Sequence, residues 1–392
     1  MRQLVRESAK GAPIRTVPFR FLRAWLRIGE RGYSGAGQTG EADLYTLREH
    51  RLPGGRDLLL YGRAVHDEAP GLALPAEPSG AEPHLRWHPL QGEWVAYAGA
   101  RQARTFLPEA AACPLCPAKE GRLGEIPFTG FEVVVFENRF PAFAATSAAP
   151  MLAGVETAPA AGRCEVVVFS ADHTGGLGSF SLDRLALLIE VWGARVEALG
   201  KTYPYILPFE NRGEEIGVTL HHPHGQIYAF PFVPVRAARA AGAQAEAPVV
   251  ARLIETADSA LVLDDDGEAL ALVPPFAMYP YETWIVPRRR VPGPAALRPS
   301  ETEAMARLLR RGVRRLDGLF GRPMPYILIV QTAPRGFENS FHMTIEIRPF
   351  LRDANKLKYL AGVEQGSGVF LVDVPPELAA ERLRAVSPGG EA

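Results

Sequence analysis

Residues 203–232 read YPYILPFENRGEEIGVTLHHPHGQIYAFPF, and residues 324–350 read MPYILIVQTAPRGFENSFHMTIEIRPF. Each stretch follows a segment with the apolar spacing of an amphipathic helix, at residues 181–200 and 299–321. Short apolar runs typical of β-strands precede both helices. The repeated order of strand, helix and strand predicts a duplicated α+β unit, with a histidine-rich strand in the first copy and a worn version of it in the second.

The individual elements follow from hydrophobic periodicity and from the residues at their ends. Ser181 is a suitable N-cap for the first long helix. Residues 259–276 are expected to form a hairpin, and residues 235–248 a linker or an exposed helix. Strands are expected at residues 57–62, 94–98, 131–138, 164–170, 217–220, 282–289, 326–334 and 340–350.

The length of 392 residues suggests two domains or one large one, because single cores usually stop growing near ~250–300 residues. We expect a poorly ordered extension over residues 1–40, which is basic and partly apolar but lacks the pattern of a signal peptide. A Pro/Ala/Gly-rich linker is expected over residues 68–83. The duplication places an N-terminal half over residues 41–240 and a C-terminal half over residues 245–392.

The charge and hydropathy of the chain argue against two classes of partner. Lysine plus arginine total 43 against 44 for aspartate plus glutamate, so the formal net charge is −1. No global field therefore attracts nucleic acid or a membrane surface, and any anion must be bound by local groups. No apolar run approaches the ~18 residues of a transmembrane helix. We expect no nucleic-acid partner and no membrane association.

The three cysteines are too few and too unevenly spaced for a disulfide framework, which favours a reducing, cytoplasmic setting. Cys113 and Cys116 form a CxxC pair, a spacing shared by metal sites and redox sites. Their proline-rich flanks lack the helix N-terminus that redox thiols use, so the metal interpretation is favoured. Cys164 begins an expected strand and is interpreted as a small core residue.

Three histidines occur within residues 221–226, which read HHPHGQ. In an extended chain His222 and His224 project to one side, with the proline between them opposite. The proline places the cluster at a strand edge or a bend, and the glycine permits close approach to the backbone. A nucleophilic imidazole at His224 and an amide at Gln226 could act on one anionic group, as nucleotidyl transfer requires. A structural metal site and solvated surface histidines are the alternatives that the pattern leaves open.

This segment resembles the active-site motif of the galactose-1-phosphate uridylyltransferases, a family within the histidine-triad fold group. The resemblance continues in the same order over residues ~84–392. It is carried by CPLC at 113–116, FENRF at 136–140, VVVFSADH at 166–173, GKTYPYILPFENRG at 200–213, YPYETWIVP at 279–287, LAGVE at 360–364 and ELAAERLRAVS at 377–387. It implies two tandem histidine-triad-like units, each an antiparallel sheet or half-barrel with a long packed helix.

The resemblance implies an enzyme of the Leloir pathway of galactose metabolism that exchanges UMP between UDP-glucose and galactose 1-phosphate. His224 would be the nucleophile that takes up the uridylyl group and releases glucose 1-phosphate, before UDP-galactose is formed. Gln226 would hydrogen-bond the phosphoryl oxygens, and Thr219 would be a further phosphate contact. The other ring nitrogen of His224 is expected to donate to the backbone carbonyl of His222, which leaves the attacking nitrogen unprotonated.

The same resemblance implies one structural zinc per chain. Cys113, Cys116, His173 and His222 match the zinc positions of the family and form a Cys₂His₂ set, a normal composition for a closed tetrahedral site. His222 would then be a ligand, and His224 would be free to react. His221 has no counterpart in the motif and receives no role.

A second metal site, present in some members of the family, is not expected here. Thr344 and Glu346 stand where two histidines of the second copy would be, and His342 does not align with a ligand. The remaining ligand positions fall near Gln331 and within residues 236–240, which offer no replacement.

Other substrate contacts are implied position by position. Arg101 and Arg104 match a basic pair near the phosphates, and the planar fork of arginine suits that task. Two arginines at this spacing would otherwise be interpreted as solvated. Further matches to nucleotide, phosphate and hexose contacts are Asn138, Asn211, Gly217, Lys358, Tyr359, Val363 and Glu364. Because the segment around residues 358–364 enters the partner subunit's site in relatives, the resemblance also implies a homodimer.

Two other functions stay open. A phosphorylase or adenylyltransferase of the same fold group, acting on an ADP-sugar or a dinucleoside polyphosphate, would share the chemistry of His224. Glu346 in the second copy is compatible with it. A zinc-stabilised binding module without catalysis would leave His224 and Gln226 without a purpose.

Overall fold

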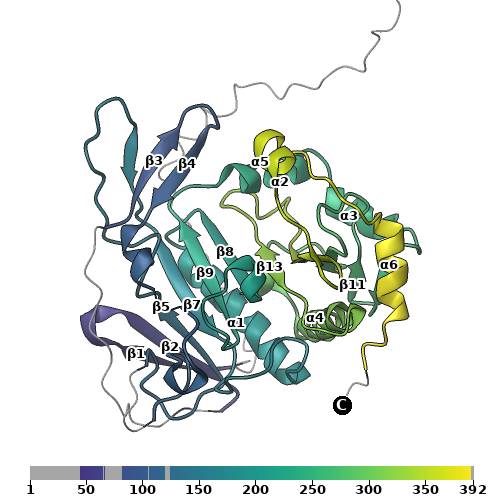
Figure 1. Ribbon diagram of the computed structural model, residues 1–392, viewed down its shortest axis with the longest axis horizontal. Helices are drawn as coiled ribbons and strands as arrows, with labels where there is room; N and C mark the ends of the chain where they lie inside the picture. Colours follow the sequence, from purple (N-terminus) through teal and green to yellow (C-terminus); the bar gives the residue numbers. More distant parts are fainter. Residues whose placement is uncertain (1–44, 65, 67–81, 105, 120–123, 390–392) are drawn as a thin grey trace, which may run out of the picture. The chain divides into compact units, whose positions relative to one another are not determined.

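The computed structural model describes residues 45–64, 66, 82–104, 106–119 and 124–389. The extension expected at residues 1–40 and most of the linker expected at 68–83 lie outside these ranges. Within them, eleven strands form one antiparallel sheet (Figure 1). Their spatial order is β1 (Thr46–Arg51), β2 (Asp57–Gly62), β5 (Val133–Glu137), β7 (Arg163–Val168), β9 (His224–Phe230), β8 (Tyr205–Arg212), β13 (Tyr326–Gln331), β14 (Thr344–Pro349), β12 (Thr283–Pro287), β11 (Ala269–Leu272) and β10 (Val262–Asp265).

Smaller elements surround the sheet. Two further sheets consist of β4 (Glu93–Tyr97), β3 (His84–His88) and β6 (Thr157–Pro159), and of β15 (Leu351–Asp353) and β16 (Lys356–Leu357). The α-helices are α1 (Leu182–Gly200), α2 (Val235–Glu246), α3 (Val249–Glu255), α4 (Pro299–Leu319), α5 (Gly362–Ser367) and α6 (Pro376–Ala385). Short 3₁₀ turns are η2 (Pro53–Gly55), η3 (Gly99–Ala103), η4 (Ala110–Ala112), η5 (Glu214–Ile216) and η6 (Pro294–Ala296).

The order of the strands confirms the duplicated α+β unit. In the first copy β5, β7, β9 and β8 lie side by side, and α1 connects β7 to β8. In the second copy β11, β12, β14 and β13 lie in the same order, and α4 connects β12 to β13. The copies meet at β8 and β13, which pair antiparallel with Arg212 opposite Tyr326. One continuous sheet therefore crosses both copies.

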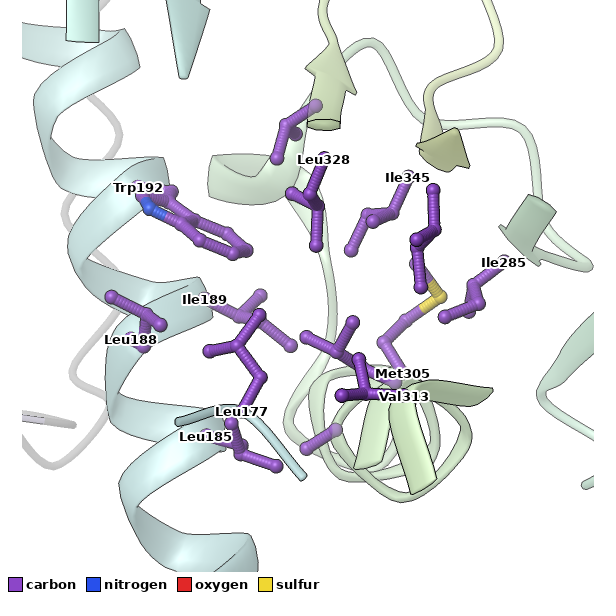
Figure 2. Packing of buried hydrophobic residues seen from close by; sticks show 14 of the residues in the cluster. Leu177, Leu185, Leu188, Ile189, Trp192, Ile285, Met305, Val313, Leu328 and Ile345 are labelled. Atoms are coloured by element: carbon purple, nitrogen blue, oxygen red, sulfur yellow. The ribbon is translucent and has the colours of Figure 1, made fainter. Parts of the chain in front are cut away.

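The two long helices pack against each other and against one face of this sheet. Ser181 begins α1 by accepting a hydrogen bond from the backbone of Arg184 at 3.2 Å, as expected for an N-cap. Figure 2 shows Trp192 of α1 and Met305 of α4 pointing into one apolar cluster that also includes strand residues. Burial of each such side chain contributes about 1.5–3 kcal/mol. Because the cluster draws on both copies, each copy depends on the other for its core.

Two expectations are corrected or resolved. Residues 217–220 are not a strand: Gly217 has a left-handed backbone, with φ of 80°, and ends η5. The apolar residues after it belong to a loop between β8 and β9. Residues 235–246 form the helix α2 rather than a linker.

Among the helices of the described chain, none combines the length and the apolar character needed to cross a bilayer.

Candidate active site

A pocket of about 250 Å³ lies over strands β8 and β9. Side chains alternate along a strand, so Ile227, which packs in the helix-covered core, leaves His224 and Gln226 on the opposite face of the sheet. The pocket is lined by Arg101, Arg104, Phe209, Asn211, Gly217, Val218, Thr219, His224, Gln226 and Tyr228. All but Phe209, Val218 and Tyr228 are predicted from the sequence. The fold thus brings seven expected substrate contacts to one place.

The imidazole of His224 is oriented by the backbone next to it. Its Nδ1 lies 2.7 Å from the carbonyl oxygen of His222, so the expected hydrogen bond is confirmed. Because a carbonyl can only accept, Nδ1 carries the hydrogen and Nε2 keeps its lone pair. Burial lowers the pKa of His224, which favours the neutral ring. Nε2 is therefore the atom of this residue that can act as a nucleophile.

Gly225 lies where the central strands press together. A Cβ atom at this position would lie 2.7 Å from the carbonyl oxygen of Phe209 and 2.8 Å from the ring of Phe169. The backbone two residues earlier is also held, since the carbonyl of Pro223 accepts a hydrogen bond from the backbone N–H of Phe169 at 3.1 Å. The close approach expected at this glycine is confirmed. It sets the backbone on both sides of the reactive imidazole.

We expect Gly225→Ala to destabilise the fold by roughly 1–3 kcal/mol, because neither the backbone of Phe209 nor the packed ring of Phe169 can move freely. Urea denaturation followed by circular dichroism measures the change. Gly242→Ala is the matched control, since a Cβ in that part of α2 meets nothing within 4 Å. The control should be neutral or slightly stabilising. Equal stabilities of the two variants would contradict the packing argument.

The loop between β8 and β9 forms one wall of the pocket and is fastened to the second copy. Arg212 donates to both carboxylate oxygens of Asp317 on α4, at 2.8 and 3.0 Å. Gly213 has a φ of 107°, and a Cβ there would lie 2.7 Å from Pro325. The wall at residues 217–219 is therefore positioned by the turn between α4 and β13.

Arg101 and Arg104 enter the pocket from η3 and the residue after it. Their hydrogen bonds go to uncharged oxygens: Arg101 Nη1 donates to the Phe140 carbonyl at 3.3 Å and to the Tyr228 hydroxyl at 3.1 Å, and Arg104 Nε donates to the Arg101 carbonyl at 3.1 Å. Burial and the charge of Arg101 lower the pKa of Arg104. Two adjacent cations without a carboxylate partner in the described residues favour an anionic ligand.

A second cluster of polar side chains lies beside the start of β9. The ligand atoms of Cys113, Cys116, His173 and His222 all lie within 4.8 Å of one another. Cys116 Sγ lies 3.3 Å from Nδ1 of His173 and 3.4 Å from Nδ1 of His222. The four residues come from the loop after η4, the loop after β7 and the approach to β9. The structure therefore assembles the set that the resemblance implies.

The chemistry of this cluster fits a zinc ion. His222 Nε2 lies 2.8 Å from the Ser170 carbonyl, which fixes the hydrogen on Nε2 and turns the lone pair of Nδ1 toward the cysteines. Burial raises the pKa of Cys113 to about 11. A bound cation would therefore have to displace a proton from that thiol, as structural zinc does. Two sulfurs and two imidazoles make a closed tetrahedral set.

The cysteine loop is also part of a small apolar core. Cys113 and Cys116 pack with Phe128, Val168 and other buried side chains on the pocket side of the sheet, where Val168 is the register partner of His224. Glu125 in the same loop accepts from Arg56 and Arg139, each at 3.1 Å. The Cys₂His₂ cluster and the imidazole of His224 thus share one supporting structure.

Several predicted contacts lie outside the lining of the pocket. Asn138 directly follows β5, and its Oδ1 accepts a hydrogen bond from the backbone N–H of Phe140 at 2.8 Å. Lys358 pairs with Glu364, and this contact lowers the pKa of Glu364 to about 2. The exposed fraction is 70% for Tyr359 and 46% for Val363. None of these residues is among those that line the pocket of His224, and their roles stay predictions.

The two residues without an assigned role have defined surroundings. His221 is half exposed, and its Nε2 lies 3.2 Å from Glu214. Cys164 is fully buried and packs in an apolar cluster with Phe143 and Leu85. The interpretation of Cys164 as a core residue is confirmed.

The second copy keeps part of the pattern of the first. His342 Nε2 lies 2.7 Å from the Pro287 carbonyl, as His222 Nε2 lies against Ser170. Glu346 accepts from Thr344 at 3.2 Å and pairs with Arg348. These contacts occupy the carboxylate that a second metal would need. The expected lack of a second metal site stays a prediction.

Fold and site together define a class of protein: a duplicated α+β chain whose central strand presents an oriented histidine to an arginine-lined pocket, beside a Cys₂His₂ cluster. The chain belongs to the galactose-1-phosphate uridyl transferase family. The family model of the N-terminal domain matches residues 75–234, and that of the C-terminal domain matches residues 244–389.

Comparisons with individual proteins and solved structures agree with this family assignment. The chain is 37% identical over 319 residues to the galactose-1-phosphate uridylyltransferase of Thermotoga maritima, covering 76% of this chain and 97% of that one. A solved structure described as a uridylyltransferase is 30% identical and covers 77% of this chain and 97% of its own, with a TM-score of 0.68. An ADP-glucose phosphorylase from Arabidopsis thaliana shares the fold, with a TM-score of 0.59 and 23% identity over 78% of this chain and 99% of that one.

Proposed function

We propose that this protein is a UDP-glucose–hexose-1-phosphate uridylyltransferase, which exchanges UMP between UDP-glucose and galactose 1-phosphate. The observation that carries the proposal is His224, whose Nδ1 is hydrogen-bonded at 2.7 Å to a carbonyl and whose side chain lines a pocket with Arg101 and Arg104. Membership of the family and similarity to the Thermotoga maritima enzyme support the substrates.

The proposed reaction has two steps that share one pocket. First, the lone pair of His224 Nε2 attacks the α-phosphorus of UDP-glucose. A phosphorus–nitrogen bond forms, the bond from phosphorus to the bridging oxygen breaks, and glucose 1-phosphate leaves. Second, a phosphate oxygen of galactose 1-phosphate attacks the same phosphorus, which breaks the phosphorus–nitrogen bond and forms UDP-galactose. A covalent intermediate allows one set of contacts to serve both sugar phosphates in turn.

The remaining pocket residues have roles in charge and orientation. Arg101 and Arg104 would bind the phosphate oxygens of the nucleotide, where negative charge concentrates in both steps. Gln226 lies on the same face of β9 as His224 and would donate its amide to the phosphoryl group. Thr219, Asn211 and Gly217 form the wall that would enclose it.

A structural zinc is part of the proposal. Cys113, Cys116, His173 and His222 would hold it, and when bound it would supply a cross-link between their loops rather than a Lewis acid. The carbonyl of His222 that orients His224 belongs to one of these residues. The cluster would therefore support the geometry of the nucleophile from two residues away.

The proposal extends to the organisation of the protein. We place the two halves at residues 41–240 and 245–392, after an extension at 1–40. Tyr359 and Val363 are exposed, as are Val369 and Leu371 farther along the chain. A homodimer that covers this apolar segment would bring the proposed hexose contacts to a partner's pocket. The free thiols of all three cysteines favour the cytoplasm.

Incubation with labelled UDP-glucose tests the proposed function. We expect the mass of the protein to rise by one uridylyl group, and galactose 1-phosphate to discharge that group as UDP-galactose. ADP-glucose is the parallel substrate, because the related fold of an ADP-glucose phosphorylase makes adenylyl transfer the second candidate. Adenylylation without uridylylation would replace the proposal, and lack of any label would favour a non-catalytic module.

A further inference from the structure

Tyr228 is a pocket residue that neither the motif nor the proposed mechanism uses. It lies on β9, and the period of two along a strand places it on the same face as His224 and Gln226. Its side chain lines the pocket, and its hydroxyl accepts a hydrogen bond from Arg101 at 3.1 Å. The strand thus presents an imidazole, an amide and a phenol in succession.

Within the described part of the chain, two hydrogen-bond acceptors orient the guanidinium of Arg101. It belongs to η3, a five-residue 3₁₀ turn with no buried residue. Its Nη1 is shared between the Tyr228 hydroxyl and the Phe140 carbonyl, which lies at 3.3 Å. Both acceptors are uncharged, so they direct the guanidinium without neutralising it. A carboxylate in their place would compete with a phosphate for the same cation.

The ring of Tyr228 is itself fixed by packing. Phe209 meets it edge-on at 5.2 Å between centroids, and Phe143 does so at 6.1 Å. Cys164 is its register partner on β7 and is fully buried. Burial raises the pKa of Tyr228 to about 12, so the phenol stays protonated at neutral pH. The hydroxyl is therefore a stationary, uncharged acceptor.

We propose that Tyr228 is a positioning residue, which aims the guanidinium of Arg101 at the phosphates of a nucleoside diphosphate before the ligand arrives. The inference rests on the proposed function for the identity of the ligand. In this proposal, recognition of the phosphates at this wall of the pocket depends on the pair Tyr228 and Arg101 rather than on the arginine alone. Removal of the hydroxyl would leave the charge in place but lose its direction.

The test is a double-mutant cycle with Tyr228→Phe and Arg101→Gln. We expect Tyr228→Phe to lower kcat/KM for UDP-glucose roughly tenfold, mainly through KM, since a hydrogen bond to a charged group is removed. In the Arg101→Gln background the same change should cost less than about twofold, because its target is gone. Tyr205→Phe is the matched control: its hydroxyl lies 3.3 Å from Gln331 on the same sheet but does not line the pocket.

Calorimetric titration with UDP separates this inference from the proposed function, because it needs no turnover. The dissociation constants should follow the same cycle, with Tyr228→Phe weakening UDP about tenfold only when Arg101 is present. If native protein binds UDP but transfers no uridylyl group, the proposed function fails while the cycle still decides the role of Tyr228. An unchanged affinity in Tyr228→Phe, an equal loss in both backgrounds, or no UDP binding by native protein would overturn the inference.

Discussion

The variant His224→Gly is expected to lose uridylyl exchange by at least ~10⁴-fold, because removal of a covalent nucleophile leaves only the binding contributions of the pocket. The side chain is the only part of the residue that the proposed reaction uses. Its backbone pairs with Val168 on β7, and glycine can keep that pairing. Exchange of label between UDP-glucose and glucose 1-phosphate measures the loss directly, since it reports the first step and its reverse.

Two observations make this a test of chemistry rather than of folding. The thermal midpoint and the metal content of His224→Gly should match those of the native protein, because the cluster atoms belong to other residues. His221→Gly is the control, since the neighbouring histidine is half exposed and does not line the pocket. It should keep activity within about twofold. Substantial exchange in His224→Gly, or ternary-complex rather than ping-pong kinetics in the native enzyme, would refute a uridylyl-histidine intermediate.

Much of the fold could be predicted from the sequence because the repeated order of strands and helices has a clear apolar pattern. The helices that begin after Ser181 and at Pro299 have clear apolar periodicity, and the strands between them alternate or are continuously apolar. The prediction of a strand at residues 217–220 was wrong because three consecutive apolar or β-branched residues are also typical of a strand. The left-handed backbone of Gly217 ends the preceding turn, and the loop then serves as a wall of the pocket.

The residues of the candidate site also fall into two groups: those that the period of a strand predicts and those that it does not. His224 and Gln226 are close in sequence, so their shared face followed from the period of a strand. Counting two residues further along β9 would also have found Tyr228, and counting back from Asn211 along β8 would have found Phe209. Arg101 could not be found by such counting. It reaches the pocket from a distant 3₁₀ turn, and only the resemblance marked it.

Contacts between residues far apart in the chain were the feature least predictable from the sequence. The ion pair between Arg212 and Asp317 joins the pocket wall to a helix of the other copy. Nothing in the sequence distinguishes these two residues from ordinary charged residues at the surface. The same limit applies to the carbonyl of Ser170, which orients His222 from another strand end. Such contacts depend on the register of β7, β8 and β9, which periodicity alone does not determine.

Replacement of both cysteines of the cluster, Cys113→Ser with Cys116→Ser, is expected to abolish zinc binding and to destabilise the protein by several kcal/mol. Structural zinc contributes about 10 kcal/mol or more to the folding of small domains. Here the loss falls on a loop that also packs against Phe128 and Val168. Metal analysis of purified protein should give about one zinc per native chain and almost none in the variant.

The effect on activity follows from the connection between the cluster and the nucleophile. His222 would supply the ligand atom Nδ1, and its carbonyl accepts a hydrogen bond from His224 Nδ1 at 2.7 Å. Loss of the metal frees His222 to move, so that the attacking nitrogen loses its fixed tautomer and direction. Activity should therefore fall together with zinc content. Cys164→Ser is the matched control, because this buried cysteine lies outside the cluster and should leave zinc unchanged. Full zinc content in the double variant would show that the metal is bound elsewhere, and full activity without zinc would show that His224 is oriented independently of the cluster.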